Sequence, residues 1–158
     1  MFLREAMKKL GCPTFDNGVN THCVSCPMAM GGGYHPPSKQ ILLCQNSISG
    51  DQEMTKVLTH EMIHAFDDCR AELIWTDCVH HACTEIRASN LSRECRWLEE
   101  FKRLQLHGVN GQQSCVRRRA EVSVRMNPFC NKPGQAKLAV EAAWDSCYRD
   151  TAPFANVP

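Results

Sequence analysis

Eleven cysteines, spread from Cys12 to Cys147, restrict the folds open to this 158-residue chain more than any other feature. Such a density is far above ordinary cytosolic usage and indicates an oxidising compartment. Disulfides formed there restrict the unfolded chain, and each typically stabilises the native state by about 2–4 kcal/mol. Because the count is odd, at least one thiol must stay unpaired, and we expect that thiol to be Cys78.

The main competing interpretation of the cysteines is a structural zinc site. The stretch "HCVSC" forms a Cys-x2-Cys knuckle, and four residues together could supply the ligands: His22, Cys23, Cys26 and Cys44. A second close pair of cysteines, which such sites usually contain, is absent from the sequence. Disulfide bonds are therefore favoured over zinc for these cysteines.

Turn residues and hydrophobic periodicity predict one domain, residues 1–158, in which a short β-rich segment precedes helices. Glycine and proline clusters surround the apolar run "QILLC", Gln40 to Cys44, which suits a hairpin and an edge strand. Helical patterns cover residues 53–69, 76–91, 93–107, 114–126 and 134–149. The predicted class is α+β, mainly helical and disulfide-rich, with a small N-terminal β-hairpin or sheet packed on a zincin-like active-site helix and further helices.

Charge and hydropathy exclude several classes of function. The formal net charge is +1 and the basic residues are scattered, so neither nucleic acid nor an anionic membrane is expected as the main partner. No apolar run approaches the roughly 18 residues that a membrane helix needs. The start "MFLREAMKKLGC" lacks a signal-peptide or transit-peptide pattern. We expect a soluble or peripheral protein, with any import signal internal or missing.

The stretch "LTHEMIHAFDD", Leu58 to Asp68, carries the strongest chemical signal. His60 and His64 are four residues apart, one helical turn along the same stripe, so both imidazoles can reach one Zn²⁺ at about 2.0–2.1 Å. Glu61 follows His60 on the helix, where its carboxylate can hold a metal-bound water instead of binding the metal itself. The alternative is a solvated amphipathic helix whose histidines pair with Asp67 and Asp68.

A helical wheel predicts that this helix has a core face and a separate chemical face. The core face would contain Met54, Leu58, Met62, Ala65, Phe66 and Cys69, and the chemical face His60, Glu61, His64, Asp67 and Asp68.

A catalytic zinc needs a third protein ligand and an open fourth position. The metzincin pattern would place Gly and His where this chain has Asp67 and Arg70, so that class is excluded. Thermolysin-like enzymes take a glutamate from a following helix, and Glu85 lies 21 residues beyond His64. We expect Glu85 to be this ligand, in a site for one Zn²⁺ per chain. The alternatives are His81 first, then His80, Asp67 or Cys78; Glu85 could instead form a salt bridge with Arg87 or Arg93.

The roles of the remaining polar residues follow from zinc-peptidase chemistry. Glu61 would act as the catalytic base, and His80 or His81 could donate to the oxyanion of the tetrahedral state. The alternative for either histidine is a structural role. Asp67 would orient an imidazole N–H or lie exposed on the helix. The substrate would add as a strand along an edge near "QILLCQ".

Two further groups of residues are candidates for surface roles. Arg117, Arg118 and Arg119 span about 200° of a helix, so one of them could meet a lipid headgroup or a partner protein. The alternative is an exposed face paired with Glu121 and Asp145. Three tryptophans are expected to be core or half-buried packing residues, with membrane contact left open for one of them: Trp75, Trp97 and Trp144.

Several blocks of the chain, in order, resemble the mitochondrial inner-membrane ATP-synthase-processing metallopeptidase family. They are "GCPTFDNGVN", "CVSCPMAMGGGYHPPSKQILLCQN", "TKVLTHEMIHAFDDCR", "HHACTEIRASNLSRECRW", "CVRRRAEVSV" and "AWDSCYRDTAPF". The resemblance covers nearly the whole chain. It implies that His60 and His64 bind the metal and that Glu61 is catalytic. It also implies a cysteine-rich, oxidatively folded protein on the intermembrane-space side, in peripheral contact with the mitochondrial inner membrane.

The resemblance implies two activities. The first is a zinc metalloendopeptidase that trims the N-terminal extension of the precursor of the ATP synthase proton-channel subunit (subunit a, or 6). The second is a chaperone-like role, together with ATP synthase assembly factors, in building the membrane sector without proteolysis. A third class, a binding module stabilised by disulfides or structural zinc, would bind metal in a closed shell and hydrolyse nothing.

Overall fold

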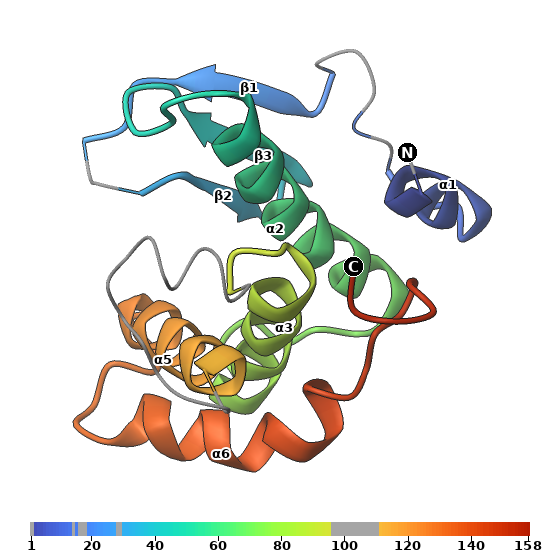
Figure 1. The fold of residues 1–158 in the computed structure, drawn as a ribbon. Coiled ribbons are helices and arrows are strands. Elements are labelled where there is room, and N and C mark those ends of the chain that lie inside the picture. Colours follow the sequence, from blue (N-terminus) through green and yellow to red (C-terminus); the bar gives the residue numbers. More distant parts are fainter. Residues whose placement is uncertain (1, 14, 16–18, 28–29, 96–110) are drawn as a thin grey trace. The chain divides into compact units, whose positions relative to one another are not determined.

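A computed structural model describes residues 2–13, 15, 19–27, 30–95 and 111–158 in two units, Met1–Glu72 and Leu73–Pro158 (Figure 1). The predicted helix over residues 93–107 lies almost entirely outside the described residues. The prediction of one domain over residues 1–158 is not tested by this division and stays a prediction.

The first unit contains a three-stranded sheet in the order β1-β3-β2. The strands are β1 (Thr21–Val24), β2 (Gly32–His35) and β3 (Gln40–Cys44). The strands β2 and β3 form the expected antiparallel hairpin, with Tyr34 opposite Ile41, whereas β1 runs parallel to β3 and sets Thr21 opposite Ile41.

The prediction that "QILLC" forms an edge strand is wrong, because β3 is the central strand and pairs on both sides. Its backbone groups are already used within the sheet, so a substrate cannot add along it, and that prediction is wrong as well. The glycine-rich strand β2 and the mostly exposed strand β1 carry little hydrophobic pattern, which is why β3 seemed isolated in the sequence.

Two helices accompany the sheet in this unit: α1 (Phe2–Lys9), which the sequence analysis did not predict, and α2 (Asp51–Arg70). At the start of α2, the backbone N–H and the hydroxyl of Ser49 donate to Glu53 Oε2, at 2.7 and 2.5 Å, which holds the first turn. The residue that precedes β2 packs very closely against α2. A Cβ added at Gly31 would lie 2.7 Å from Val57 Cγ2, so the strand can approach the helix this closely only as glycine.

The second unit is helical, with α3 (Cys78–Leu91), α5 (Gly111–Met126) and α6 (Gln135–Cys147), all close to the predicted ranges. Its core is built from small side chains and disulfide cysteines on all three helices, which lets the helices pack closely. The indole of Trp144 is buried there and stacks on Tyr148 with ring centroids 4.6 Å apart, and Trp75 is half-buried, as expected of packing residues. Trp97 lies outside the described residues.

Ten of the eleven cysteines form five disulfides, and every bridge lies within one unit. The bridges are Cys12–Cys69 and Cys26–Cys44 in the first unit, and Cys78–Cys130, Cys83–Cys147 and Cys95–Cys115 in the second. The unpaired residue is the exposed Cys23, so the expectation for Cys78 is wrong. The Cys26–Cys44 bridge also rules out the zinc knuckle, because it removes two of the four supposed ligands.

Candidate metal centre

The middle of α2 brings His60, Glu61 and His64 together on successive turns of one helix. The imidazole rings of His60 and His64 meet edge to face, with centroids 4.8 Å apart and planes at 75°. His60 is half-buried, whereas His64 and Glu61 are buried. Two imidazoles one turn apart with a neighbouring carboxylate form a donor set that fits a metal ion with an adjacent base.

The burial of α2 differs from the two-faced helix that the wheel predicts. Every residue from Glu61 to Asp67 is buried, including the polar side chains, while Met54 of the expected core face is 38% exposed. The side chains of Glu61, His64 and Asp67 are therefore shielded from bulk water, and the alternative of a solvated amphipathic helix is wrong. Low local dielectric strengthens the interactions of these groups with charge.

The carboxylates of Asp67 and Asp68 accept hydrogen bonds from Arg70 and from the β2–β3 hairpin. Arg70 Nε donates to Asp67 Oδ1 at 2.9 Å, and Asp67 is only 3% exposed, so the alternative that Asp67 lies exposed is wrong, while its orienting role stays a prediction. Asp68 Oδ2 accepts from the Tyr34 hydroxyl at 2.7 Å and from Lys39 Nζ at 2.5 Å. These bonds fasten the C-terminal half of α2 to the β2–β3 hairpin.

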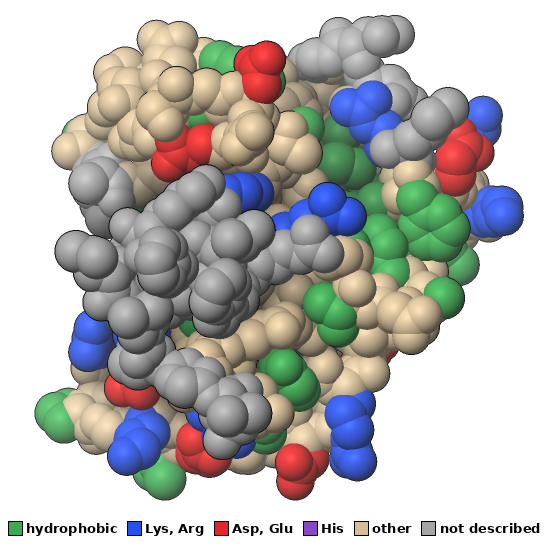
Figure 2. Space-filling model, viewed as in Figure 1, with side chains coloured by type: hydrophobic (Ala, Val, Ile, Leu, Met, Phe, Trp, Pro, Cys, Tyr) green, Lys and Arg blue, Asp and Glu red, His purple; other side chains and the backbone are tan. Residues whose placement is uncertain are grey.

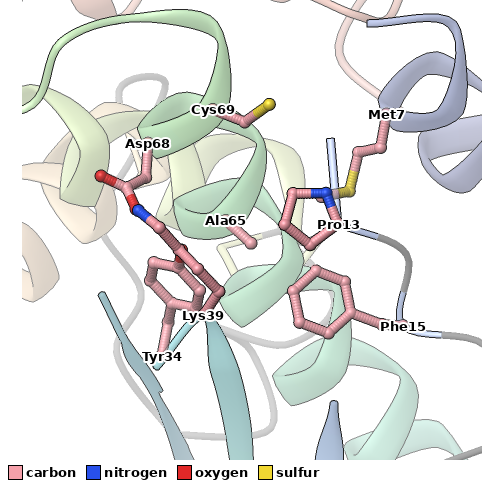
Figure 3. A pocket seen from close by; sticks show the side chains of 8 residues that line it. All are labelled: Met7, Pro13, Phe15, Tyr34, Lys39, Ala65, Asp68 and Cys69. Carbon is pink, nitrogen blue, oxygen red and sulfur yellow. The ribbon is translucent and has the colours of Figure 1, made fainter. Parts of the chain in front are cut away.

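A small pocket of about 160 Å³ lies beside this end of α2 (Figure 3). Lys39 and Tyr34 approach Asp68 on one wall, and Pro13 and Phe15 lie on another. The remaining lining residues are Met7, Ala65 and Cys69. Burial and the hydrogen bond to Asp68 raise the pKa of the Tyr34 phenol, so this group is neutral under ordinary conditions.

In the second unit, α3 brings Glu85 together with His81. Glu85 is buried, and its Oε1 lies 3.3 Å from Nε2 of His81 one turn earlier. Arg87, which the sequence offers as an alternative salt-bridge partner of Glu85, forms an ion pair with Asp150. Asp150 Oδ1 lies 2.7 Å from the guanidinium Nη1. A buried carboxylate beside an imidazole is suited to hold a cation.

The structure places the remaining candidates of this helix apart from that pair. His80 Nδ1 accepts from the backbone N–H of Ile74 at 3.2 Å. Asp77 caps α3 by accepting from the N–H groups of Val79 and His80, and these bonds lower the pKa of its carboxyl. Cys78 is oxidised in the bridge to Cys130, so it cannot act as a thiolate ligand.

Side chains of both signs are interspersed on the face shown in Figure 2. Of the arginine triplet, Arg117 pairs with Glu141 at 2.7 Å and lies over the Trp144 ring, and Arg119 pairs with Glu94 at 2.5 Å. The partners are thus carboxylates of other segments rather than Glu121 and Asp145. Among the helices that the structure describes, none is both long enough and apolar enough to cross a membrane.

In the sequence, Asn127 is recognisable only as a helix breaker, yet its side chain contacts His81 of the α3 pair. Asn127 Nδ2 lies 3.0 Å from His81 Nδ1 and 2.9 Å from the backbone oxygen of Trp75. The one signal in the sequence was the Asn-Pro dipeptide after a helix, because asparagine there commonly bonds to nearby backbone.

Comparison with known proteins gives one consistent picture. The model of the peptidase M76 family matches residues 1–155. The chain is 48% identical to the mitochondrial inner membrane protease ATP23 of Saccharomyces cerevisiae (strain ATCC 204508 / S288c) over 162 residues, covering 99% of this chain and 71% of the relative. Proteins of the same name from Meyerozyma guilliermondii and Neosartorya fischeri are 44% and 42% identical, over 99% of this chain and 64% and 65% of theirs. No solved structure matches.

Proposed function

The chain belongs to the peptidase M76 family, and from that premise we propose that it is a zinc metalloendopeptidase with Glu61 as its catalytic base. The resemblance noted in the sequence is thereby confirmed at the level of the family. The observation that carries the proposal is the placement of His60, Glu61 and His64 on successive turns of α2, with Glu61 and His64 buried.

The proposed zinc ligands are His60, His64 and Glu85, one ion per chain. Two imidazole nitrogens and one carboxylate oxygen are the donor set of many zinc peptidases, which keep a fourth position open. When bound, zinc would acidify a water and polarise the scissile carbonyl. The burial of His64 and Glu85 supports this assignment, because low local dielectric strengthens the attraction of such donors for a cation.

Glu61 carries the proton transfers in this proposal. Its carboxylate takes a proton from the attacking water and returns it to the amine of the departing peptide. The two transfers balance, so Glu61 ends the cycle ionised. Because Glu61 follows His60 directly in α2, its carboxylate would lie near an ion held by the two histidines without serving as a ligand.

The proposed substrate is the N-terminal extension of the precursor of the ATP synthase proton-channel subunit, on the intermembrane-space side of the mitochondrial inner membrane. Two observations support the location: the relatives are named mitochondrial inner membrane proteases, and five disulfides suit an oxidising compartment. Peripheral contact with the membrane and with ATP synthase assembly factors belongs to the same proposal. An assembly role that needs no proteolysis remains the alternative function.

The test combines metal analysis with cleavage of a peptide that spans the precursor's processing site. The oxidised wild type is compared with Glu61→Gln and with Glu72→Gln, a matched change at an exposed glutamate. We expect about one zinc in all three proteins and a loss of at least about 10²-fold in cleavage only for Glu61→Gln. Absence of stoichiometric zinc from the wild type would overturn the proposal. Zinc without cleavage in any of the three would favour the assembly role.

A further inference from the structure

A series of polar contacts in the second unit leads from Asn127 to Glu85. Asn127 follows the end of α5, and its side-chain Oδ1 accepts from the backbone N–H of Phe129 at 3.0 Å. Its Nδ2 donates to the backbone oxygen of Trp75 and lies 3.0 Å from His81 Nδ1. On the far side of the ring, His81 Nε2 lies 3.3 Å from Glu85 Oε1.

These contacts determine which atom donates and which accepts at each step from Asn127 to Glu85. A backbone N–H can only donate and a backbone carbonyl can only accept, so Phe129 and Trp75 fix which end of the Asn127 amide is oxygen and which is nitrogen. The second hydrogen of Nδ2 then points to His81 Nδ1, which must accept it. The ring proton of neutral His81 therefore sits on Nε2 and is donated to Glu85.

The surroundings hold this series of contacts in place. The disulfide Cys78–Cys130 joins the first turn of α3 to the segment that follows Asn127. The backbone oxygen of Asn127 also accepts from the N–H of Cys130 at 2.9 Å. The side chains of His81 and Glu85 are only 12% and 7% exposed, so water competes little for the contact between them.

We propose that Asn127 is a positioning residue for metal binding: through the tautomer of His81, it sets the orientation of the Glu85 carboxylate. The inference rests on the proposed role of Glu85 as a zinc ligand. Ligating carboxylates are themselves commonly hydrogen-bonded, and loss of such a partner typically weakens metal binding by about 10- to 100-fold. His81 is thus a donor to a ligand and not a ligand itself.

A purely structural role for Asn127 in the turn after α5 makes a different prediction, which a double-mutant cycle separates. Zinc affinity is measured on the oxidised full chain by competition with a fluorescent chelator, for Asn127→Ala, His81→Phe and the double variant. We expect each single change to weaken zinc binding about 10- to 100-fold, and the double variant to bind no more weakly than His81→Phe. Asn131→Ala, which removes an exposed amide from the same loop, should bind like the wild type.

Equal effects of Asn127→Ala with and without His81 would overturn the inference, since Asn127 would then act by another route. Wild-type affinity in Asn127→Ala would overturn it too. Glu85→Gln separates the two proposals. Wild-type zinc affinity in that variant would refute Glu85 as a ligand, whereas weakened binding in Glu85→Gln together with wild-type affinity in Asn127→Ala would refute only the positioning role. If Asn127→Ala does not fold, His81→Gln serves instead. Its side-chain amide N–H restores a donor, so this variant should bind zinc more tightly than His81→Phe. Equal affinity of the two variants would refute the role of His81 as a donor to Glu85.

Discussion

Replacing Arg87 by methionine should destabilise the second unit more than a typical point mutation does. The guanidinium is 1% exposed and binds the C-terminal tail in three places: the Asp150 carboxylate at 2.7 Å, and the backbone oxygens of Asp150 and Ala152. Methionine keeps the length and most of the volume of the side chain, so the change removes the charge and its hydrogen bonds rather than the packing.

The magnitude follows from these three bonds. A hydrogen bond to a charged group contributes about 1.5–3 kcal/mol, but the Asp150 side chain is 33% exposed and water can replace part of what is lost. Three such bonds would sum to about 4.5–9 kcal/mol. Because water replaces part of this, we expect a loss of about 3–5 kcal/mol. In a chain of this size, that corresponds to a fall in Tm of roughly 6–20 °C.

The assay is thermal and urea unfolding of the oxidised protein, followed by circular dichroism. Arg149→Met is the matched control, because Arg149 is an exposed arginine with a single bond from Nε to the Asp145 backbone oxygen, and its effect should stay within about 0.5 kcal/mol. Arg87→Lys should recover only part of the loss, since an ammonium cannot reproduce the fork of the guanidinium. A Tm for Arg87→Met within about 2 °C of the wild type, less than a 1 kcal/mol loss would give, would refute the reasoning.

Three further predictions concern the first unit. Gly32→Ala should lower Tm by several degrees, because the new Cβ would lie 2.6 Å from the Leu42 backbone oxygen, whereas Gly50→Ala meets no atom within 4 Å and serves as the comparison. A thiol reagent should label one cysteine per native chain and none in Cys23→Ser; labelling that persists in the variant would contradict the assigned pairing. The raised pKa of Tyr34 stabilises the folded state fully below the ordinary phenol pKa of about 10, and that stability is lost as pH rises above it. The free energy of unfolding, measured between pH 8 and 11, should fall more steeply in the wild type than in Tyr34→Phe. Parallel curves for the two proteins would contradict this prediction.

Much of the helical architecture could be predicted from the sequence. The helix expected over 53–69 is observed as Asp51–Arg70, and the one over 114–126 as Gly111–Met126. Apolar periodicity and breakers such as Asn127-Pro128 act over a few neighbouring residues, so they predict where helices begin and end without knowledge of tertiary contacts. The short helix α1 was missed because eight residues carry too little periodicity to stand out.

Within the candidate site, the sequence predicts contacts inside one helix but not contacts between distant segments. The spacing of His60, Glu61 and His64 is a property of one helix, so their proximity on α2 follows directly from the sequence. The link from Asn127 through His81 to Glu85 joins residues 46 and 4 positions apart, and only the shorter step is visible as a helical spacing. A partner from another segment leaves no periodic trace.

The sequence by itself therefore determined the oxidised, mainly helical class of the protein, its family and the histidine–glutamate motif on a single helix. Tertiary structure alone decided which cysteine stays free, that β3 is central, and that Arg87 pairs with Asp150. The physical reason is that backbone periodicity constrains neighbours within one turn or one strand, whereas partner choice depends on which distant segments packing brings together.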